Sequence, residues 1–436
     1  MFRQLTSLSN KLVQRYLPDP YLFVVLLTFV VFLFALMLTP SGPKELVIMW
    51  GSKFWDLLTF SMQMVLILVT GYVLANSPIF KTLLGKLASI AKSPSTAIIL
   101  VTFISIVASW INWGFGLVIG ALFARELARQ VKVDYRLLIA SAYSGFVVWH
   151  GGLSGSIPLT IATEGHFTQE IIGIIPTSET LFSTFNLVIV FAVAIILPIA
   201  NRFMYNEKEA VVINPKLLEE PTEKGKFQPV TPAERLENSW LVSVLIGGIG
   251  LVFVIHHFVT NGFKLDLNIV NFTFLFLGIL FHFRPRNFLQ SVQNAVKGAS
   301  GIIIQFPFYA GIMGMMVSSG LAERISQWFV SISNEVTFPL LAFISAGIVN
   351  IFVPSGGGQW AVQAHIMLEA GADLGIAPAV TAMAVAWGDA WTNLIQPFWA
   401  LPVLAIAGLK AKDIMGFCLI NLFVTGIIIG AVFLLF

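Results

Sequence analysis

Four short breaks, rich in glycine, hydroxyl and amide residues, interrupt otherwise apolar stretches of this sequence. Glycine lets backbone amides approach a ligand closely, and amides at a helix N-terminus favour an anion. Lipid cannot satisfy free backbone groups, so broken helices persist at membrane depth only where protein or a water-filled cavity covers them. The pattern predicts one central binding site. The breaks are Asn112–Gly116, His150–Pro158, Pro354–Gln359 and Gly388–Gln396.

Side chains and amides in these breaks suit a carboxylate ligand. Serine, threonine and asparagine supply hydrogen-bonding groups, and the run that begins at Pro354 is the best candidate for an anion-binding helix N-terminus. The alternative is a flexible kink between packed helices. The predicted substrate-binding residues are Asn112, Gly114, Gly116, Ser154, Ser156, Ser355, Gly356, Gly357, Gly358, Gln359, Thr392 and Asn393.

Two ionisable residues, Asp389 and His150, lie within the breaks. Acids inside membrane segments are energetically expensive and usually functional, so Asp389 is expected to bind a coupling cation or a proton. Its structural alternative is a helix N-cap. His150 is a candidate proton carrier or substrate donor, with a hydrogen-bonded structural histidine as the alternative. We expect Na⁺ or H⁺ as the coupling ion and no other cofactor or metal.

The composition requires a membrane setting for these breaks. Of the 436 residues, 57% are hydrophobic and 11% are charged, whereas soluble domains average about 25% charged residues. Many apolar runs reach the roughly 20 residues that a spanning helix needs. The single cysteine, Cys418, excludes disulfides within the chain. The fold class predicted is an all-α polytopic membrane protein, surrounded by lipid and without a nucleic-acid partner.

A polar stretch at 201–238 divides the chain nearly in half. It carries four prolines and is predicted to be a cytoplasmic connector. The N-terminal membrane half is then 1–200 and the C-terminal half 239–436. The prolines are Pro215, Pro221, Pro229 and Pro232.

Each half contains one stretch of unsuitable length for a simple crossing. The stretches 96–124 and 338–368 are too long for one upright helix and too short for two crossings, and each has a break at its centre. They are predicted to be re-entrant hairpins. The stretches 137–163 and 376–407 are predicted to be broken transmembrane helices.

The placement of basic residues supports this topology. If both hairpins are re-entrant and every other apolar segment crosses once, all but four of the 25 Lys and Arg residues fall on one side. The positive-inside rule then places the N-terminus in the cytoplasm and the C-terminus outside. The four exceptions are Lys44, Lys53, Lys264 and Arg324.

The two hairpins would open to opposite sides, as two inverted-topology repeats require. The sequence contains weak internal similarity that fits such repeats. Trp149 and Trp387, and likewise Pro158 and Pro397, are separated by the same interval to within one residue. Chance alignment of glycine and tryptophan in apolar sequence is the alternative.

Other functional classes have less support. The short pattern around Ser154 matches that at the nucleophile of rhomboid-type intramembrane serine proteases, but no histidine lies in a supporting motif. No P-loop, zinc-protease or dinucleotide motif is found. A channel would also use broken helices, although opposed hairpins fit alternating access better. A transporter is therefore favoured over an enzyme.

Several motifs resemble the AtoE-type short-chain fatty acid transporter family, which is grouped with the ion transporter superfamily. The resemblance runs nearly end to end. The motifs are Leu17-Pro18-Asp19-Pro20, Ile111-Asn112-Trp113-Gly114-Phe115-Gly116, Gln305-Phe306-Pro307-Phe308-Tyr309-Ala310-Gly311, Val353-Pro354-Ser355-Gly356-Gly357-Gly358 and Gln396-Pro397-Phe398-Trp399-Ala400-Leu401-Pro402.

The resemblance implies uptake of acetoacetate, butyrate and similar monocarboxylates across a bacterial cytoplasmic (inner) membrane. It also implies elevator-like movement and a scaffold that often forms homodimers. Superfamily members that carry dicarboxylates bind carboxylate and sodium through a Ser-Asn-Thr pattern at the hairpin tips. The tips here, at Asn112 and Ser355, lack that pattern. The alternative substrates are dicarboxylates or other organic anions, and the remote alternative is a serine protease using Ser154.

Overall fold

The computed structural model describes residues 2–214, 230–262 and 267–436, and its regular elements in that part are all helical. Eight helical segments there are long and apolar enough to cross a membrane, or nine if the bent pair at 378–407 counts as one span. The predicted class, an all-α polytopic membrane protein, is confirmed.

The first half of the chain contains a long series of helices joined by short turns. Prolines at the first position and serine or asparagine caps begin many of them. The helices are α1 (Phe2–Tyr16), α2 (Pro20–Leu38), α3 (Pro43–Ser52), α4 (Leu58–Asn76), α5 (Pro78–Ala88), α6 (Pro94–Ile111), α7 (Trp113–Gln130), α8 (Tyr135–Ser144), η1 (Gly145–Gly151), α9 (Ser156–Ile161), α10 (Gln169–Ile172) and α11 (Thr184–Met204).

The second half follows a similar order. The lengths of α4 and α16 are the same, 19 residues, and those of α5 and α17 are also equal, at 11. The inverted relation between the halves stays a prediction. The helices are α13 (Trp240–Asn261), α14 (Leu267–His282), α15 (Pro285–Val296), α16 (Ser300–Ser318), α17 (Leu321–Ser331), α18 (Phe338–Phe352), α19 (Gly356–Asp373), α20 (Pro378–Thr392), η4 (Asn393–Ile395), α21 (Pro397–Ala407) and α22 (Ala411–Leu435).

The connector begins later than predicted, because α11 continues to Met204. Two short helices follow, η2 (Glu207–Glu209) and α12 (Pro232–Glu237). The capping box between Thr231 and Glu234 begins α12. Pro215, Pro221 and Pro229 lie outside the described residues.

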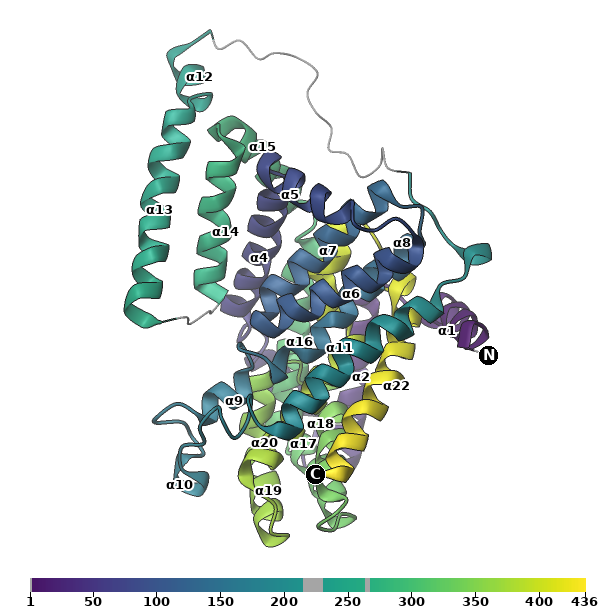
Figure 1. Cartoon of the computed structure of the whole chain (residues 1–436). Coiled ribbons are helices and arrows are strands. Elements are labelled where there is room, and N and C mark those ends of the chain that lie inside the picture. Colours follow the sequence, from purple (N-terminus) through teal and green to yellow (C-terminus); the bar gives the residue numbers. More distant parts are fainter. Residues whose placement is uncertain (1, 215–229, 263–266) are drawn as a thin grey trace.

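Both stretches predicted to be hairpins form pairs of helices that are longer than the predicted ranges. The first pair, α6 and α7, extends to Gln130, and the second, α18 and α19, extends to Asp373. Charged residues such as Glu126 and Arg129 continue α7, since they are good helix formers and pair with one another. Figure 1 shows α5 and α7 in the upper part of the molecule and α17, α18 and α19 in the lower part.

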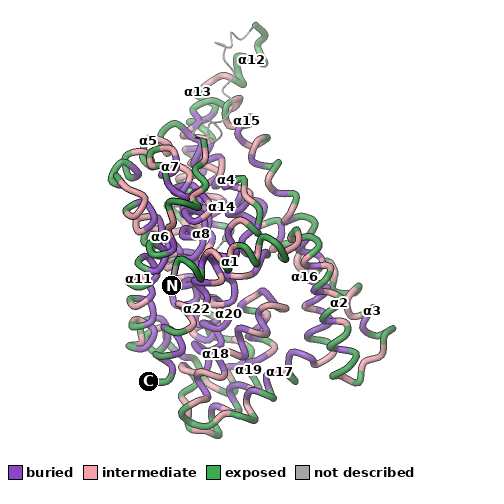
Figure 2. Tube along the Cα trace, turned by 90° about the vertical axis from the view of Figure 1, so that its right-hand side faces the viewer, coloured by how far each residue is buried: buried purple, intermediate pink, exposed green. Residues whose placement is uncertain are grey.

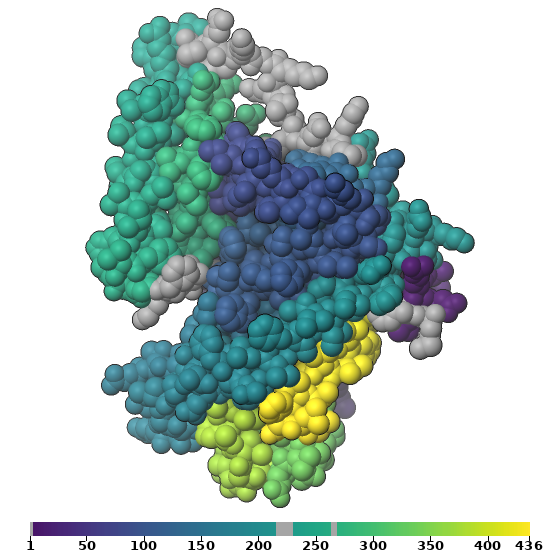
Figure 3. Space-filling view, viewed as in Figure 1, coloured from purple at the N-terminus to yellow at the C-terminus, as the bar shows by residue number. Residues whose placement is uncertain are grey.

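The buried centre is formed by the broken helices and by the helices around them. Figure 2 shows buried residues concentrated around α7, α8 and α20. By contrast α13, which packs on α14 and forms the left edge of Figure 3, exposes many apolar side chains, as does α2. Such apolar surfaces suit contact with lipid tails.

Candidate functional site

The first helical pair is broken by a single residue, Asn112. Its side-chain Oδ1 accepts a hydrogen bond from the backbone N–H of Phe115 at 3.0 Å and so caps α7. Asn112 is buried. A Cβ added at Gly116 would lie 2.5 Å from the Cα of Ser109, so Gly116 is required for close packing of α6 against α7.

This tip is bonded to the first broken helix. The backbone N–H of Trp113 donates to Ser154 Oγ at 3.0 Å, and the N–H of Leu153 donates to the carbonyl of Trp110 at 2.7 Å. The indole N–H of Trp110 donates in turn to the carbonyl of Gly151 at 3.1 Å. These bonds join the first tip to the segment between η1 and α9.

The second tip spans Val353 to Ser355. Ser355 Oγ accepts from the N–H of Gly358 at 3.3 Å and caps α19, the role that Asn112 has in α7. The next residue, Gly356, is packed so closely that an added Cβ would lie 2.4 Å from Ser156 Oγ and 2.6 Å from the His150 ring. Gly357 has no atom within 4 Å of such a Cβ. The second tip therefore rests on the first broken helix through Gly356.

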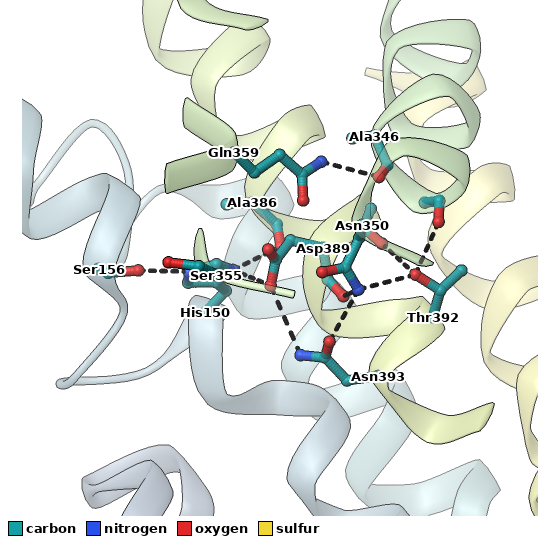
Figure 4. Close-up of polar contacts among 12 residues, drawn as sticks. His150, Ser156, Ala346, Asn350, Ser355, Gln359, Ala386, Asp389, Thr392 and Asn393 are labelled. Carbon is teal, nitrogen blue, oxygen red and sulfur yellow. Dashed lines mark hydrogen bonds and ion pairs between the residues drawn. The ribbon is translucent and has the colours of Figure 1, made fainter. Parts of the chain in front are cut away.

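The second broken helix is fixed by Asn350 of α18. The side-chain amide of Asn350 donates to the carbonyl of Asp389 at 2.7 Å, to Thr392 Oγ1 at 2.9 Å and to Asn393 Oδ1 at 2.7 Å (Figure 4). The carbonyl of Asn350 accepts from the side chain of Gln396. All five side chains are buried. Together they hold the chain where α20 ends and α21 begins, at a bend of 48°.

His150 and Asp389 meet between the two broken helices. His150 Nδ1 lies 2.7 Å from the carbonyl of Ala386 and 3.6 Å from Asp389 Oδ1, while Nε2 lies 2.9 Å from Ser156 Oγ (Figure 4). A carbonyl can only accept, so Nδ1 carries a proton. In the neutral imidazole, Nε2 then accepts from the Ser156 hydroxyl; in the cation it donates to the same oxygen. The neutral and the protonated forms of His150 are therefore both compatible with the observed distances to Ala386 and Ser156.

Four buried side-chain oxygens near this meeting point have no hydrogen-bond partner among the described residues. Three of them belong to side-chain amides whose nitrogen donates to a backbone carbonyl. Asn350 donates to the carbonyl of Asp389, Gln359 to that of Ala346 and Gln396 to that of Asn350, and these bonds fix the orientation of each amide. The oxygens are thereby left free to accept a proton donor or bind a cation. They are Asp389 Oδ2, Asn350 Oδ1, Gln359 Oε1 and Gln396 Oε1.

An aromatic cluster lies beside the first tip. Trp113 packs edge-on against Trp399 of α21 at 5.4 Å, and the ring of Trp149 lies 6.0 Å from Trp399. Phe146 stacks on Trp149 at 5.8 Å. The indole N–H groups of Trp149 and Trp399 are buried without a hydrogen-bond partner among the described residues. The cluster combines apolar rings with two free donors.

The structure thus divides the predicted site residues between two places. His150, Ser156, Gly356, Asp389, Thr392 and Asn393 lie at or next to the junction of the broken helices, and Gln359 faces it from α19. Asn112 belongs to the first tip, and Ser154, in the segment between η1 and α9, is bonded to that tip. Gly114 lies in the first turn of α7, and Gly357 is exposed.

Two residues of the junction, Asn350 and Gln396, were not among the predicted site residues. Asn350 is an amide within an apolar run, and this is the signal that the sequence offers for it. Gln396 directly precedes Pro397, at the limit of a predicted break. Neither was marked by glycine or by a charge.

Comparison with known proteins decides the family. The family model described as "Short chain fatty acid transporter" matches residues 1–436. A provisionally named short-chain fatty acid transporter of Escherichia coli (strain K12) is 46% identical over 432 residues, which cover 98% of each chain. A provisionally named relative from Haemophilus influenzae is 45% identical over 447 residues, with 100% of both chains covered. This chain belongs to the short-chain fatty acid transporter family.

A solved structure is also similar. The YdaH transporter of Alcanivorax borkumensis aligns over 95% of this chain and 98% of its own, at 16% sequence identity and a TM-score of 0.44.

Membership of the family has direct consequences. The chain is a multi-pass membrane protein that transports a small carboxylate, and its relatives are transporters, not enzymes. The protease alternative is thereby set aside. In the transporter, Ser154 is bonded to the amide of Trp113, and the serine in contact with a histidine is Ser156.

Proposed function

We propose that the transporter takes up acetoacetate, butyrate and similar short-chain monocarboxylates across the bacterial cytoplasmic membrane, by secondary active transport coupled to H⁺ or Na⁺. The observation that carries the proposal is the buried junction of the two broken helices. Asp389 and His150 meet there, close to four side-chain oxygens that have no hydrogen-bond partner in the part of the chain that the structure describes.

Charge balance supports coupling at Asp389. A carboxylate buried in a membrane protein is costly unless a proton or a cation neutralises it. An anionic substrate that approaches this junction adds a second negative charge. His150 is the ionisable side chain in contact with Asp389, and it is fully buried as well. Co-entry of one proton or one Na⁺ would offset the added charge.

The two tips and the aromatic cluster offer complementary surfaces for a short fatty acid. The helices α7 and α19 begin at the tips, so their N-terminal amides and dipoles favour a carboxylate. The rings of Phe146, Trp149 and Trp399 suit a short acyl tail. No Lys or Arg occurs in 96–124 or 338–368, so a single carboxylate is favoured over two.

We further propose elevator-like alternating access, with the N-terminus in the cytoplasm and the C-terminus outside. The helical pairs α6–α7 and α18–α19 lie toward opposite ends of the molecule (Figure 1), as hairpins that gate opposite faces would. The positive-inside rule supports this orientation.

Uptake into proteoliposomes tests the proposal. Radiolabelled butyrate and acetoacetate are offered under an imposed proton gradient, a sodium gradient or neither, with Asp389→Asn beside the unmodified protein and Asp373→Asn as control. Asp373 is exposed at the end of α19. We expect gradient-driven accumulation by the unmodified protein and the control. Asp389→Asn should lose accumulation above the external concentration and keep exchange of labelled for unlabelled substrate.

Each outcome has a clear meaning. Loss of accumulation with exchange retained assigns coupling to Asp389, and the gradient that drives uptake names the ion. Accumulation by Asp389→Asn equal to that of the unmodified protein removes the coupling role. If folded protein transports no short monocarboxylate in a saturable way, the substrate assignment fails, and dicarboxylates are screened next.

A further inference from the structure

A cavity lies at the far ends of two helices that contribute to the central site. Its volume is about 470 Å³, within the range that small-molecule sites occupy. One wall is the C-terminal end of α21, and another is the C-terminal part of α7. The described residues that line it are Leu68, Tyr72, Arg125, Ile213, Asn294, Ala295, Lys297, Gly298, Ala405, Ile406, Ala407 and Gly408.

The cavity is separate from the central site. Arg125 follows Trp113 by twelve residues along α7, which corresponds to about 18 Å of helix. On α21, Ala405 is likewise more than two turns from Pro397. Both helices therefore begin at the central site and reach this cavity further along.

Among the described residues that line the cavity, the two charged ones are both basic. The guanidinium of Arg125 lies 5.8 Å from the centre of the Tyr72 ring, a cation–π contact that orients it against the wall. Lys297 Nζ donates to Asn294 Oδ1 at 3.0 Å. The described lining therefore carries two positive charges, which favour an anion over a cation.

Two of the backbone carbonyls that end α21 are engaged by other donors. The carbonyl of Ala407 accepts from the Tyr135 hydroxyl at 2.9 Å, and that of Leu404 accepts from the amides of Gly408 and Leu409. Apolar side chains complete the walls, with Leu68, Ala295 and Ile406 buried. A ligand with one negative end and a short apolar body fits this combination.

We propose that this cavity is a peripheral binding site for short-chain carboxylates, at which the anion is held between the cytoplasm and the central site. The cytoplasmic assignment rests on the proposed function, because it uses the orientation given there. Inorganic phosphate or the headgroup of an anionic lipid could use the same basic residues, but neither has a short apolar body to place against Leu68 and Ile406.

Modification of an introduced cysteine tests the site without a transport assay. Ala405→Cys, with Ile213→Cys as a second reporter, is treated with an anionic and a cationic methanethiosulfonate reagent. Native Cys418 is fully buried, so unmodified protein gives the background. Ser7→Cys is the control, since it lies in another cavity of about 310 Å³ whose lining contains Arg3, Lys11 and also Glu209.

We expect the anionic reagent to modify both reporters at least fivefold faster than the cationic one, and the double variant Arg125→Gln/Lys297→Gln to abolish most of that preference. Millimolar butyrate should slow the modification at both reporters and leave Ser7→Cys unchanged. The same protection is expected in the Asp389→Asn background, because the two sites are separate.

Three results would overturn the site: no anion preference, protection by phosphate as strong as that by butyrate, or protection only in nanodiscs of phosphatidylglycerol and not of phosphatidylcholine. The last would assign the cavity to a lipid headgroup. Saturable butyrate uptake without protection would overturn this site alone. If butyrate is neither taken up in a saturable way nor protects the reporters, the proposed substrate is overturned as well.

Discussion

The two helical tips contact the same broken helix in different ways. The first tip is held by directional hydrogen bonds: Trp113 N–H to Ser154, and Leu153 N–H to Trp110. The second tip touches His150 and Ser156 through the close approach of Gly356, and the neighbouring Gly357 is exposed. A hydrogen-bonded tip is fixed in register, whereas a tip held by packing can lift away. We infer that the second tip is the more mobile gate.

The largest effect is expected from Gly356→Ala. Its Cβ would lie 2.4 Å from Ser156 Oγ and 2.6 Å from His150, so either these two side chains or the tip must shift. We expect butyrate uptake to fall at least tenfold, which corresponds to about 1.4 kcal/mol. Gly357→Ala is the matched control, with no atom within 4 Å of the added group, and should stay within twofold. Equal uptake by both variants would remove the gate from the second tip.

The next largest effect concerns the junction itself. Asn350→Ala removes the donor to the carbonyl of Asp389, to Thr392 and to Asn393. Each buried acceptor left without a donor costs roughly 1–3 kcal/mol of stability. We expect a lower unfolding temperature in detergent, measured by a thermal shift, together with a smaller fall in uptake than that of Gly356→Ala. Asn294→Ala, which is partly exposed, should leave the unfolding temperature nearly unchanged. An unchanged temperature for Asn350→Ala would show that the junction is not a structural support.

A smaller effect is expected at the aromatic cluster. Trp399→Phe keeps an aromatic ring but removes a buried indole N–H and makes room beside Trp149. We expect a shift of about threefold in preference toward longer acyl chains, since each CH₂ buried contributes about 0.8 kcal/mol. Competition of butyrate uptake by acetate, hexanoate and octanoate measures this shift. Trp328→Phe, at an exposed position, is the control. An unchanged order of competitors would place the acyl tail elsewhere.

The smallest effect should follow from loosening the first tip. Ser154→Ala removes the acceptor for the amide of Trp113, a change of about 1 kcal/mol. We expect uptake to fall a few-fold with little change in substrate preference. Ser89→Ala, at the exposed C-cap position of α5, serves as control. If Ser154→Ala reduced uptake more than Gly356→Ala, the proposed difference between the tips would be reversed.

Much of the architecture was predictable because hydropathy and helix breakers act locally. The all-α class, the family and the breaks at Asn112, at Ser355 and before Pro397 all follow from local patterns. The helix ends were less predictable, since α7 continues through Glu126 and Arg129, which hydropathy alone does not recognise. The hairpin topology and the substrate roles stay predictions.

The junction could not be assembled from sequence. His150 meets the carbonyl of Ala386 and the side chain of Asp389 across more than half of the chain. Which nitrogen of His150 carries a proton depends on that distant carbonyl. Asn350 was missed because its partners, on α20 and η4, become neighbours only after folding.

The first broken helix has a consequence for biogenesis. The segment Tyr135–Ile161 has the lowest mean hydropathy of the eight candidate spans and is almost entirely buried by protein, whereas α2 has the highest and is largely exposed. A nascent segment inserts according to its own affinity for lipid. We therefore expect α2 to enter the bilayer by itself during synthesis. The segment that carries His150 is expected to remain in the bilayer only after the helices that bury it have inserted. Assembly of the central site is then a late step in the maturation of the protein.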